Sequence, residues 1–245
     1  MDVLLVDLSL GLVLLGLVSV VRPLRTLRIR TRRAGMAVTV VGILLLLLGL
    51  LLPVAPEHLD GPRMALDEIL PAYQFGEAHE IRVHAPPERV LAAARAVTAR
   101  EIRFFRLLTW LRAPHWGRAR ESILNPAADQ PLLDVAVRSG FLLLREDAGR
   151  EIVFGSVVCC GPRQRPRDAA EFQALQGSLA RAVMNFHVTD EGSGVTRLVT
   201  QTRIAASDAS AERRFAAYWR LIYPGSAVIR RMWLRAIRDR AELKP

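Results

Sequence analysis

Two long apolar runs open the chain, over residues 3–21 and 34–52. The first contains one charged residue, Asp7, and the second contains none. A helix of this length spans roughly 28 Å, close to the hydrocarbon core of a bilayer, which is about 30 Å thick. The pattern therefore predicts two transmembrane helices. The alternative for the first run is a cleaved signal peptide, but signal peptides carry positive charge before the apolar stretch, and here Asp2 precedes it.

The segment between the runs, residues 22–33, is rich in arginine. Short loops rich in basic residues stay on the cytoplasmic side of a membrane, where they also meet anionic lipid headgroups. We interpret residues 1–55 as a helical hairpin in the cell membrane, with the remaining chain outside the cytoplasm. A nucleic-acid-binding arm must be free to reach phosphates, and a loop held between two spans is not. The six arginines are Arg22, Arg25, Arg28, Arg30, Arg32 and Arg33.

The second run contains a stripe of small residues. Gly35, Gly42 and Gly49 are seven residues apart, so a helix places them on one side. Small residues let two helices approach closely in lipid. The expected partner is the first helix, which contains Gly11 and Gly16. The alternative is a homodimer contact through the same stripe.

After the hairpin, the hydrophobic pattern becomes that of a soluble domain. The start of residues 56–76 is rich in proline and glycine, which predicts a linker. Residues 77–84 alternate between apolar and polar positions, which predicts a half-buried strand, and Pro87 suits the first turn of a following helix. Helical spacing continues to about residue 112, and a short helix is expected over residues 131–138.

Two hairpins and a long helix complete the domain, residues 77–245. The hairpins are predicted over residues 141–158 and 178–207, with turns at "EDAG" and "EGSG". The final helix is expected to begin after an N-cap at Asp208, to bury an apolar stripe and to kink at Pro224. This order predicts an α+β fold of the helix-grip type, in which a curved antiparallel sheet wraps around a long C-terminal helix.

The composition and the individual residues indicate few candidates for metal binding or catalysis. The net charge of +10 suits a membrane surface. Cys159 and Cys160 are adjacent and look like the end of a buried strand, with a vicinal disulfide as the alternative. The histidines do not have metal-ligand spacing, so we expect no metal, and no motif suggests a cofactor. His187 shares a strand face with Asn185 and should face solvent, which leaves no catalytic residue identifiable.

Three stretches resemble the START-like helix-grip superfamily, a group of polyketide cyclases and lipid-transport proteins. They are "EIRVHAPPERV", the "MNFHV…VTQTRI" hairpin and "FAAYWRLIYPGSAVIRRMWLRAIRDRAE", within residues 77–242. The resemblance implies a cavity between sheet and final helix that binds a lipid, sterol or polyketide, with catalysis in a minority of members. Leu91, where the family often has an aromatic residue, and the stretch 95–113 depart from the family pattern, so the ligand's identity is not carried over.

We expect the ligand to be an apolar small molecule or lipid. Threonine hydroxyls on the last strand would orient its polar end, although threonine also simply suits strands. One alternative is a cyclase or hydrolase in the same cavity, for which His79 and Glu101 are the nearest ionisable candidates. Another is a structural module whose cavity is filled by side chains. The residues expected to line the cavity are Trp110, Phe154, Met184, Phe186, Leu198, Thr200, Thr202, Phe215, Trp219 and Ile222.

Overall fold

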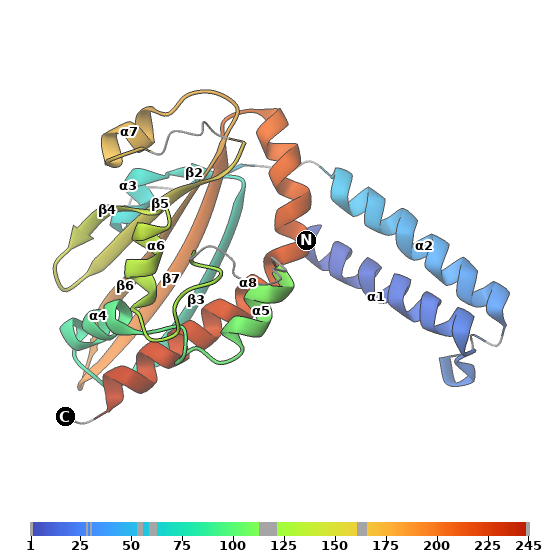
Figure 1. The fold of residues 1–245 in the computed structure, drawn as a ribbon, viewed down its shortest axis with the longest axis horizontal. Coiled ribbons are helices and arrows are strands. Elements are labelled where there is room, and N and C mark those ends of the chain that lie inside the picture. Colours follow the sequence, from blue (N-terminus) through green and yellow to red (C-terminus); the bar gives the residue numbers. More distant parts are fainter. Residues whose placement is uncertain are drawn as a thin grey trace. The chain divides into compact units, whose positions relative to one another are not determined.

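The chain folds into two units, which share the last helix (Figure 1). The computed structural model describes residues 2–27, 29, 31–52, 56–58, 63–112, 122–160 and 166–243. The hairpin unit comprises Met1–Val54 and Arg213–Tyr223, and the sheet unit comprises Ala55–Glu212 and Pro224–Pro245.

Two antiparallel helices, α1 (Asp2–Val21) and α2 (Arg32–Leu51), form most of the hairpin unit, and the short 3-10 helix η1 (Arg25–Leu27) lies between them. Both helices are long and apolar enough to cross a membrane, which confirms the two predicted helices. Of the six predicted loop arginines, Arg22, Arg32 and Arg33 are exposed. Arg25 begins η1, and Arg28 and Arg30 lie outside the described residues.

The predicted glycine stripe of α2 is buried, and it faces α1. A Cβ atom on Gly42 would lie 2.8 Å from the backbone nitrogen of Val13. On α1, Gly16 lies at the same contact, because a Cβ there would lie 2.5 Å from the backbone nitrogen of Thr39, whereas one on Gly11 would meet nothing within 4 Å. The partner of the stripe is therefore the first helix of the same chain, the first of the two alternatives.

A five-stranded antiparallel sheet, in the order β3-β7-β6-β5-β4, is the centre of the sheet unit. In its register, Ile81 pairs with Leu198 and Phe154 with Met184. The first predicted strand and both predicted hairpins are confirmed. The strands are β3 (Phe75–Val83), β4 (Leu142–Asp147), β5 (Glu151–Cys159), β6 (Ala180–Gly192) and β7 (Val195–Ala206).

The helices begin where the sequence predicts them. Pro87 opens α4 (Pro87–Ala96), and the short predicted helix is α6 (Leu132–Arg138). The side chain of Asp208 accepts hydrogen bonds from two backbone amides at the start of α8 (Ala209–Glu242), and Pro224 lies inside that helix. The helical run expected up to residue 112 is interrupted, because α5 (Phe105–Arg112) follows turns that end at Phe104, whose φ is +60°.

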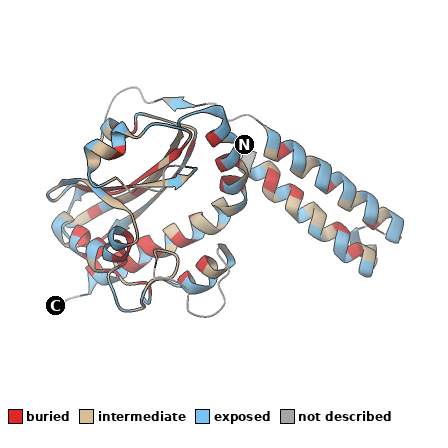
Figure 2. Ribbon diagram, turned by 45° about the horizontal axis from the view of Figure 1, so that its top comes forward, coloured by how far each residue is buried: buried red, intermediate tan, exposed pale blue. Residues whose placement is uncertain are grey.

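One face of the sheet, the inner face, packs against α4, α5, α6 and the second half of α8. Its core includes Phe186 and Trp233, whose ring centroids lie 5.1 Å apart in an edge contact. Figure 2 shows the buried residues concentrated on the sheet and on the helices that cover it. The predicted α+β helix-grip arrangement, a curved antiparallel sheet with a long C-terminal helix packed against it, is confirmed.

The opposite, outer face carries a smaller core beneath α3 (Ala65–Ile69) and α7 (Ala169–Ala174). Leu66 and Phe172 pack there against Val153 and Val183 of the sheet. The segment predicted as a linker, residues 56–76, contains α3 and the short strands β1 (Glu57–His58) and β2 (Ala72–Tyr73). A helix of five residues is too short to give a periodic apolar signal.

The expectation about the two cysteines also needs correction. Cys159 is the last residue of β5 and forms a disulfide with Cys160. The fully buried part of β5 ends at Gly155, and Cys160 is exposed with a φ of +65°. The pair therefore lies beyond the buried part of the strand and has the vicinal disulfide that was the alternative.

Candidate ligand site on the inner face of the sheet

Five polar side chains, three from the sheet and two from α8, form a cluster at the apolar inner face of the sheet. The alternation of β3 places Glu77 and His79 on the same side as Ile81, which packs against the inner core. Thr202 of β7 pairs with Glu77 in the register. The other two, Ser226 and Arg230, are four residues apart on α8 and so lie on one side of that helix. We call these five residues the inner polar cluster.

The carboxylate of Glu77 is the centre of this cluster. Its Oε1 accepts a hydrogen bond of 2.7 Å from the hydroxyl of Ser226 and lies 3.7 Å from Nε of Arg230. Its Oε2 lies 3.5 Å from Nε2 of His79. Arg230 in turn donates a hydrogen bond of 2.7 Å to the hydroxyl of Thr202. The cluster thus connects the edge strand β3 to both β7 and α8.

The cluster is buried and charged. Only 2% of the Glu77 side chain, 9% of that of His79 and 12% of that of Arg230 is exposed. Burial by itself raises the pKa of Glu77, but the contacts with His79, Arg230 and Ser226 outweigh burial, and the pKa of Glu77 is lowered overall. Glu77 is therefore an ionised carboxylate at neutral pH.

Three buried polar atoms at this place have no hydrogen-bond partner within the described part of the chain. They are Oε2 of Glu77, Nε2 of His79 and Nε1 of Trp233. The 3.5 Å contact between Glu77 and His79 is close enough for an ion pair but lacks the geometry of a hydrogen bond. The Trp233 ring lies 5.5 Å from the guanidinium of Arg230. Because a buried polar atom without a partner costs about 1–3 kcal/mol, these atoms mark a place where a polar group would bind favourably.

Six of the predicted lining residues lie on the inner face. Phe154, Met184, Phe186 and Leu198 belong to its apolar core. The hydroxyl of Thr200 donates a hydrogen bond of 2.7 Å to the backbone carbonyl of Asn185 and is satisfied within the sheet, whereas that of Thr202 belongs to the inner polar cluster.

The other four predicted lining residues lie elsewhere. Trp110, on α5, borders a separate hollow of about 280 Å³. Phe215, Trp219 and Ile222 belong to the hairpin unit, where the rings of Phe215 and Trp219 stack with centroids 6.0 Å apart. The apolar stripe of α8 runs through both units, so periodicity alone does not indicate which half of the helix packs against the sheet.

Four residues of the site are absent from the sequence-based prediction, namely Glu77, Ser226, Arg230 and Trp233. The inward position of Glu77 could have been predicted from the sequence. Side chains alternate along a strand, so Glu77 points to the same side as His79, two positions later. The burial of Arg230 depends on its position opposite Glu77, and this contact joins residues 153 positions apart.

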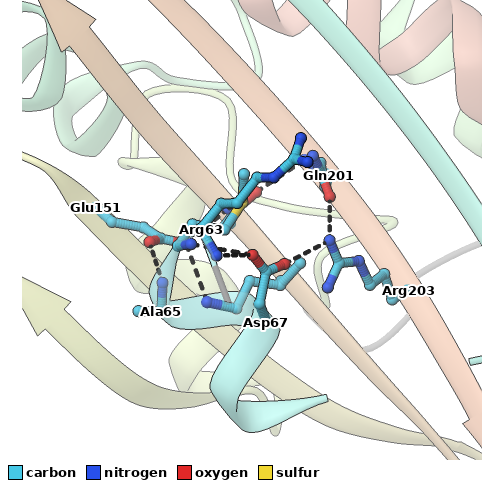
Figure 3. A network of polar contacts seen from close by, with 9 residues as sticks. Arg63, Ala65, Asp67, Glu151, Gln201 and Arg203 are labelled. Carbon is cyan, nitrogen blue, oxygen red and sulfur yellow. Dashed lines mark hydrogen bonds and ion pairs between the residues drawn. The ribbon is translucent and has the colours of Figure 1, made fainter. Parts of the chain in front are cut away.

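A second polar network lies on the outer face, where it fixes α3 to the sheet (Figure 3). The carboxylate of Glu151 accepts hydrogen bonds from the backbone amides of Ala65 and Leu66, at 2.7 and 3.3 Å. Asp67 accepts a hydrogen bond of 2.6 Å from the backbone amide of Arg63 and lies 2.7 Å from Nη2 of Arg203. Each carboxylate is used by the backbone of the α3 segment, so we interpret this network as structural.

His187 lies on this outer face, as the strand alternation predicts. It is half-buried rather than fully in solvent, and burial is the main cause that lowers its pKa. The residue lines an open groove of about 590 Å³ together with Arg63, Arg150 and Arg197. The lining of this groove comes mainly from the outward positions of β3, β6 and β7, and it also includes His79 of the inner polar cluster.

Comparisons with known proteins give distant structural likenesses, two of which are described below. No family model matches the chain, and no curated protein matches it. MLL2253 of Mesorhizobium loti is 16% identical, with a TM-score of 0.32, over 69% of this chain and 100% of that one. TTHA0849 of Thermus thermophilus is 13% identical, with a TM-score of 0.28, over 68% of this chain and 97% of that one. Similarity at this level supports no inference about function.

Proposed function

We propose that the protein is a membrane-anchored START-like protein that binds an amphipathic ligand between the sheet and the second half of α8. The observation that carries the proposal is the set of buried polar atoms without partners on Glu77, His79 and Trp233, next to an apolar surface. Ligand sites are typically apolar with a few polar groups that fix the ligand's orientation. The inner face has this composition.

The unpartnered atoms define the chemistry of the ligand's polar end. Oε2 of Glu77 requires a hydrogen-bond donor, and Nε1 of Trp233 requires an acceptor. A hydroxyl or amide group provides both. A carboxylate end would be repelled by the ionised Glu77. The apolar remainder of the ligand would pack against Met184, Phe186 and Leu198.

The test is to purify the full chain in lipid nanodiscs and to analyse its organic extract by mass spectrometry. We expect a hydroxyl- or amide-bearing lipid or apolar compound, and we expect Trp233→Phe to lower its occupancy about 10-fold through the loss of one buried hydrogen bond. The matched control is Trp219→Phe, in the hairpin unit, which should leave occupancy unchanged. Repeatedly empty extracts that also fail to take up fluorescent lipids would reject the proposal.

For the anchor, we propose that α1 and α2 span the membrane with the arginine-rich loop in the cytoplasm and the sheet unit outside it. The disulfide between Cys159 and Cys160 agrees with this location, because disulfides persist in oxidising compartments. A reporter that is active only outside the cytoplasm, fused after Pro245, should be active in intact cells. A silent reporter would reverse the orientation.

A second candidate function is acid–base catalysis in the same site. It is favoured by the position of Glu77 and His79, two buried ionisable side chains 3.5 Å apart. An ionised carboxylate beside an imidazole can orient it as a general base. If the site is catalytic, His79→Gln should still bind the ligand but stop its chemical conversion. A ligand that stays unchanged in the wild-type protein would reject this candidate.

A further inference from the structure

The first half of α8 is attached to the end of the second apolar helix through one arginine. Arg220 donates hydrogen bonds to the backbone carbonyls of Leu50 and Leu52, at 2.8 and 2.6 Å. It is only 1% exposed. The last four carbonyls of a helix have no partner within that helix, and a cation is favourable at its negative end. Arg220 therefore fixes this part of α8 at the place where α2 ends.

The second apolar helix ends at this place, and the first one begins there. A Cβ on Gly49 would lie 3.0 Å from Cγ2 of Val6, so the start of α1 lies beside the end of α2. Leu51, at the end of α2, is 80% exposed, and Leu4, at the start of α1, is 64% exposed. If the hairpin spans a membrane, as we propose above, Arg220 is at the level where the hydrocarbon core meets the headgroups.

The same segment of α8 has a second, exposed apolar face. Phe215 and Trp219 are buried, whereas Tyr218 is 38% and Leu221 is 51% exposed, and Ile222 is half-buried beside them. Residues three and four positions apart lie on one side of a helix, so these last three residues form one face. A face of this composition, adjoining the end of two apolar helices, matches a lipid surface rather than water.

We propose that the face formed by Tyr218, Leu221 and Ile222 lies in the headgroup region of the membrane, as a third lipid contact beside α1 and α2. Tyr218 and Leu221 are within two residues of Arg220, which corresponds to about 3 Å along the helix. The interfacial layer is about 5–7 Å thick on each side of the core, so both side chains fall within it. Tyrosine is enriched at this depth, and the exposed Arg213, two turns earlier, suits anionic headgroups.

The test is photo-cross-linking of the full chain in nanodiscs of phosphatidylcholine and phosphatidylglycerol. The photoreactive amino acid benzoylphenylalanine replaces Tyr218 or Leu221, and lipid adducts are counted by mass spectrometry. The positive control is the same replacement at Leu47, which is 51% exposed on α2, and the negative control is at Leu143, which is 44% exposed on β4 of the sheet unit.

We expect lipid adducts at positions 218, 221 and 47 and at least a tenfold lower yield at position 143. Adducts at 47 combined with a yield at 218 and 221 equal to that at 143 would overturn the inference and leave the membrane anchor intact. Loss of adducts at 47 as well would reject the anchor itself and, with it, the proposed lipid contact of α8.

Discussion

The side-chain amide of Asn185 donates a hydrogen bond of 2.6 Å to Glu151 beneath α3. Glu151 is 2% exposed, and Asn185 is fully buried. Because the same carboxylate also accepts hydrogen bonds from the amides of Ala65 and Leu66, it holds a helix that is too short to be stable alone. This contact explains why a segment with the composition of a linker is ordered against the sheet.

Glu151→Gln should therefore lower the free energy of unfolding by about 2–4 kcal/mol, because an amide cannot accept all the hydrogen bonds that converge on the buried carboxylate. The measurement is denaturant unfolding of the full chain in detergent, together with hydrogen exchange of residues 63–70. The control is Glu146→Gln on β4, which breaks an exposed ion pair with Arg95 and should cost at most about 1 kcal/mol. Equal losses in the two variants would contradict the structural role of Glu151.

The lowered pKa of Glu77 predicts a dependence of stability on pH. The folded pKa lies below the unfolded pKa, which is about 4.3 for glutamate, so ionised Glu77 stabilises the fold above that pH. This contribution is lost as the pH falls through the folded pKa. Glu77→Gln should therefore differ most from wild type at pH 7 and least near pH 3. Thermal unfolding at both pH values measures this, and a constant difference would show that the charge of Glu77 contributes nothing.

Gly42→Ala should loosen the hairpin, because its new Cβ would lie 2.8 Å from the backbone nitrogen of Val13, which cannot move independently of α1. Gly11→Ala has nothing within 4 Å and should be neutral or stabilising by up to about 1 kcal/mol, since alanine favours helices over glycine. Hydrogen exchange of residues 2–52 in nanodiscs would report both effects. Similar exchange in the two variants would argue against this helix contact.

Arg220→Met should release α8 from the end of α2. It removes two hydrogen bonds to the carbonyls of Leu50 and Leu52 and leaves those carbonyls unsatisfied, at a cost of about 2–4 kcal/mol. We expect faster hydrogen exchange over residues 213–223 and a lower midpoint of thermal unfolding. Arg213→Met, at an exposed position of the same helix, serves as the control. If both variants exchange alike, the contact does not hold the segment.

The features that the sequence predicted are those with long, regular patterns. The two apolar runs, both hairpins and the N-cap at Asp208 each depend on neighbouring residues, so local periodicity and turn chemistry were sufficient. The short helix α3 was missed because its stabilising partner, Glu151, is 86 residues from Ala65 in the chain. Its short apolar pattern gave no independent signal.

The candidate site was predicted only in its apolar part. Met184, Phe186 and Leu198 follow directly from strand alternation, which places them inward. The charged residues Glu77 and Arg230 were not predicted as part of the site, and their burial results from a contact between the first strand of the sheet and the last helix. Such a contact depends on the tertiary fold and cannot be predicted from local patterns in a single sequence.

The position of the last helix also has a consequence for biosynthesis. Residues 229–241 of α8 complete the core of the inner face, and β3, the first strand of the sheet, pairs with β7, more than a hundred residues later. Residues 75–241 must therefore all be synthesised before the core of the inner face can be completed. Until then the apolar side of the earlier strands lacks its cover, and surface exposed in this way is prone to aggregate.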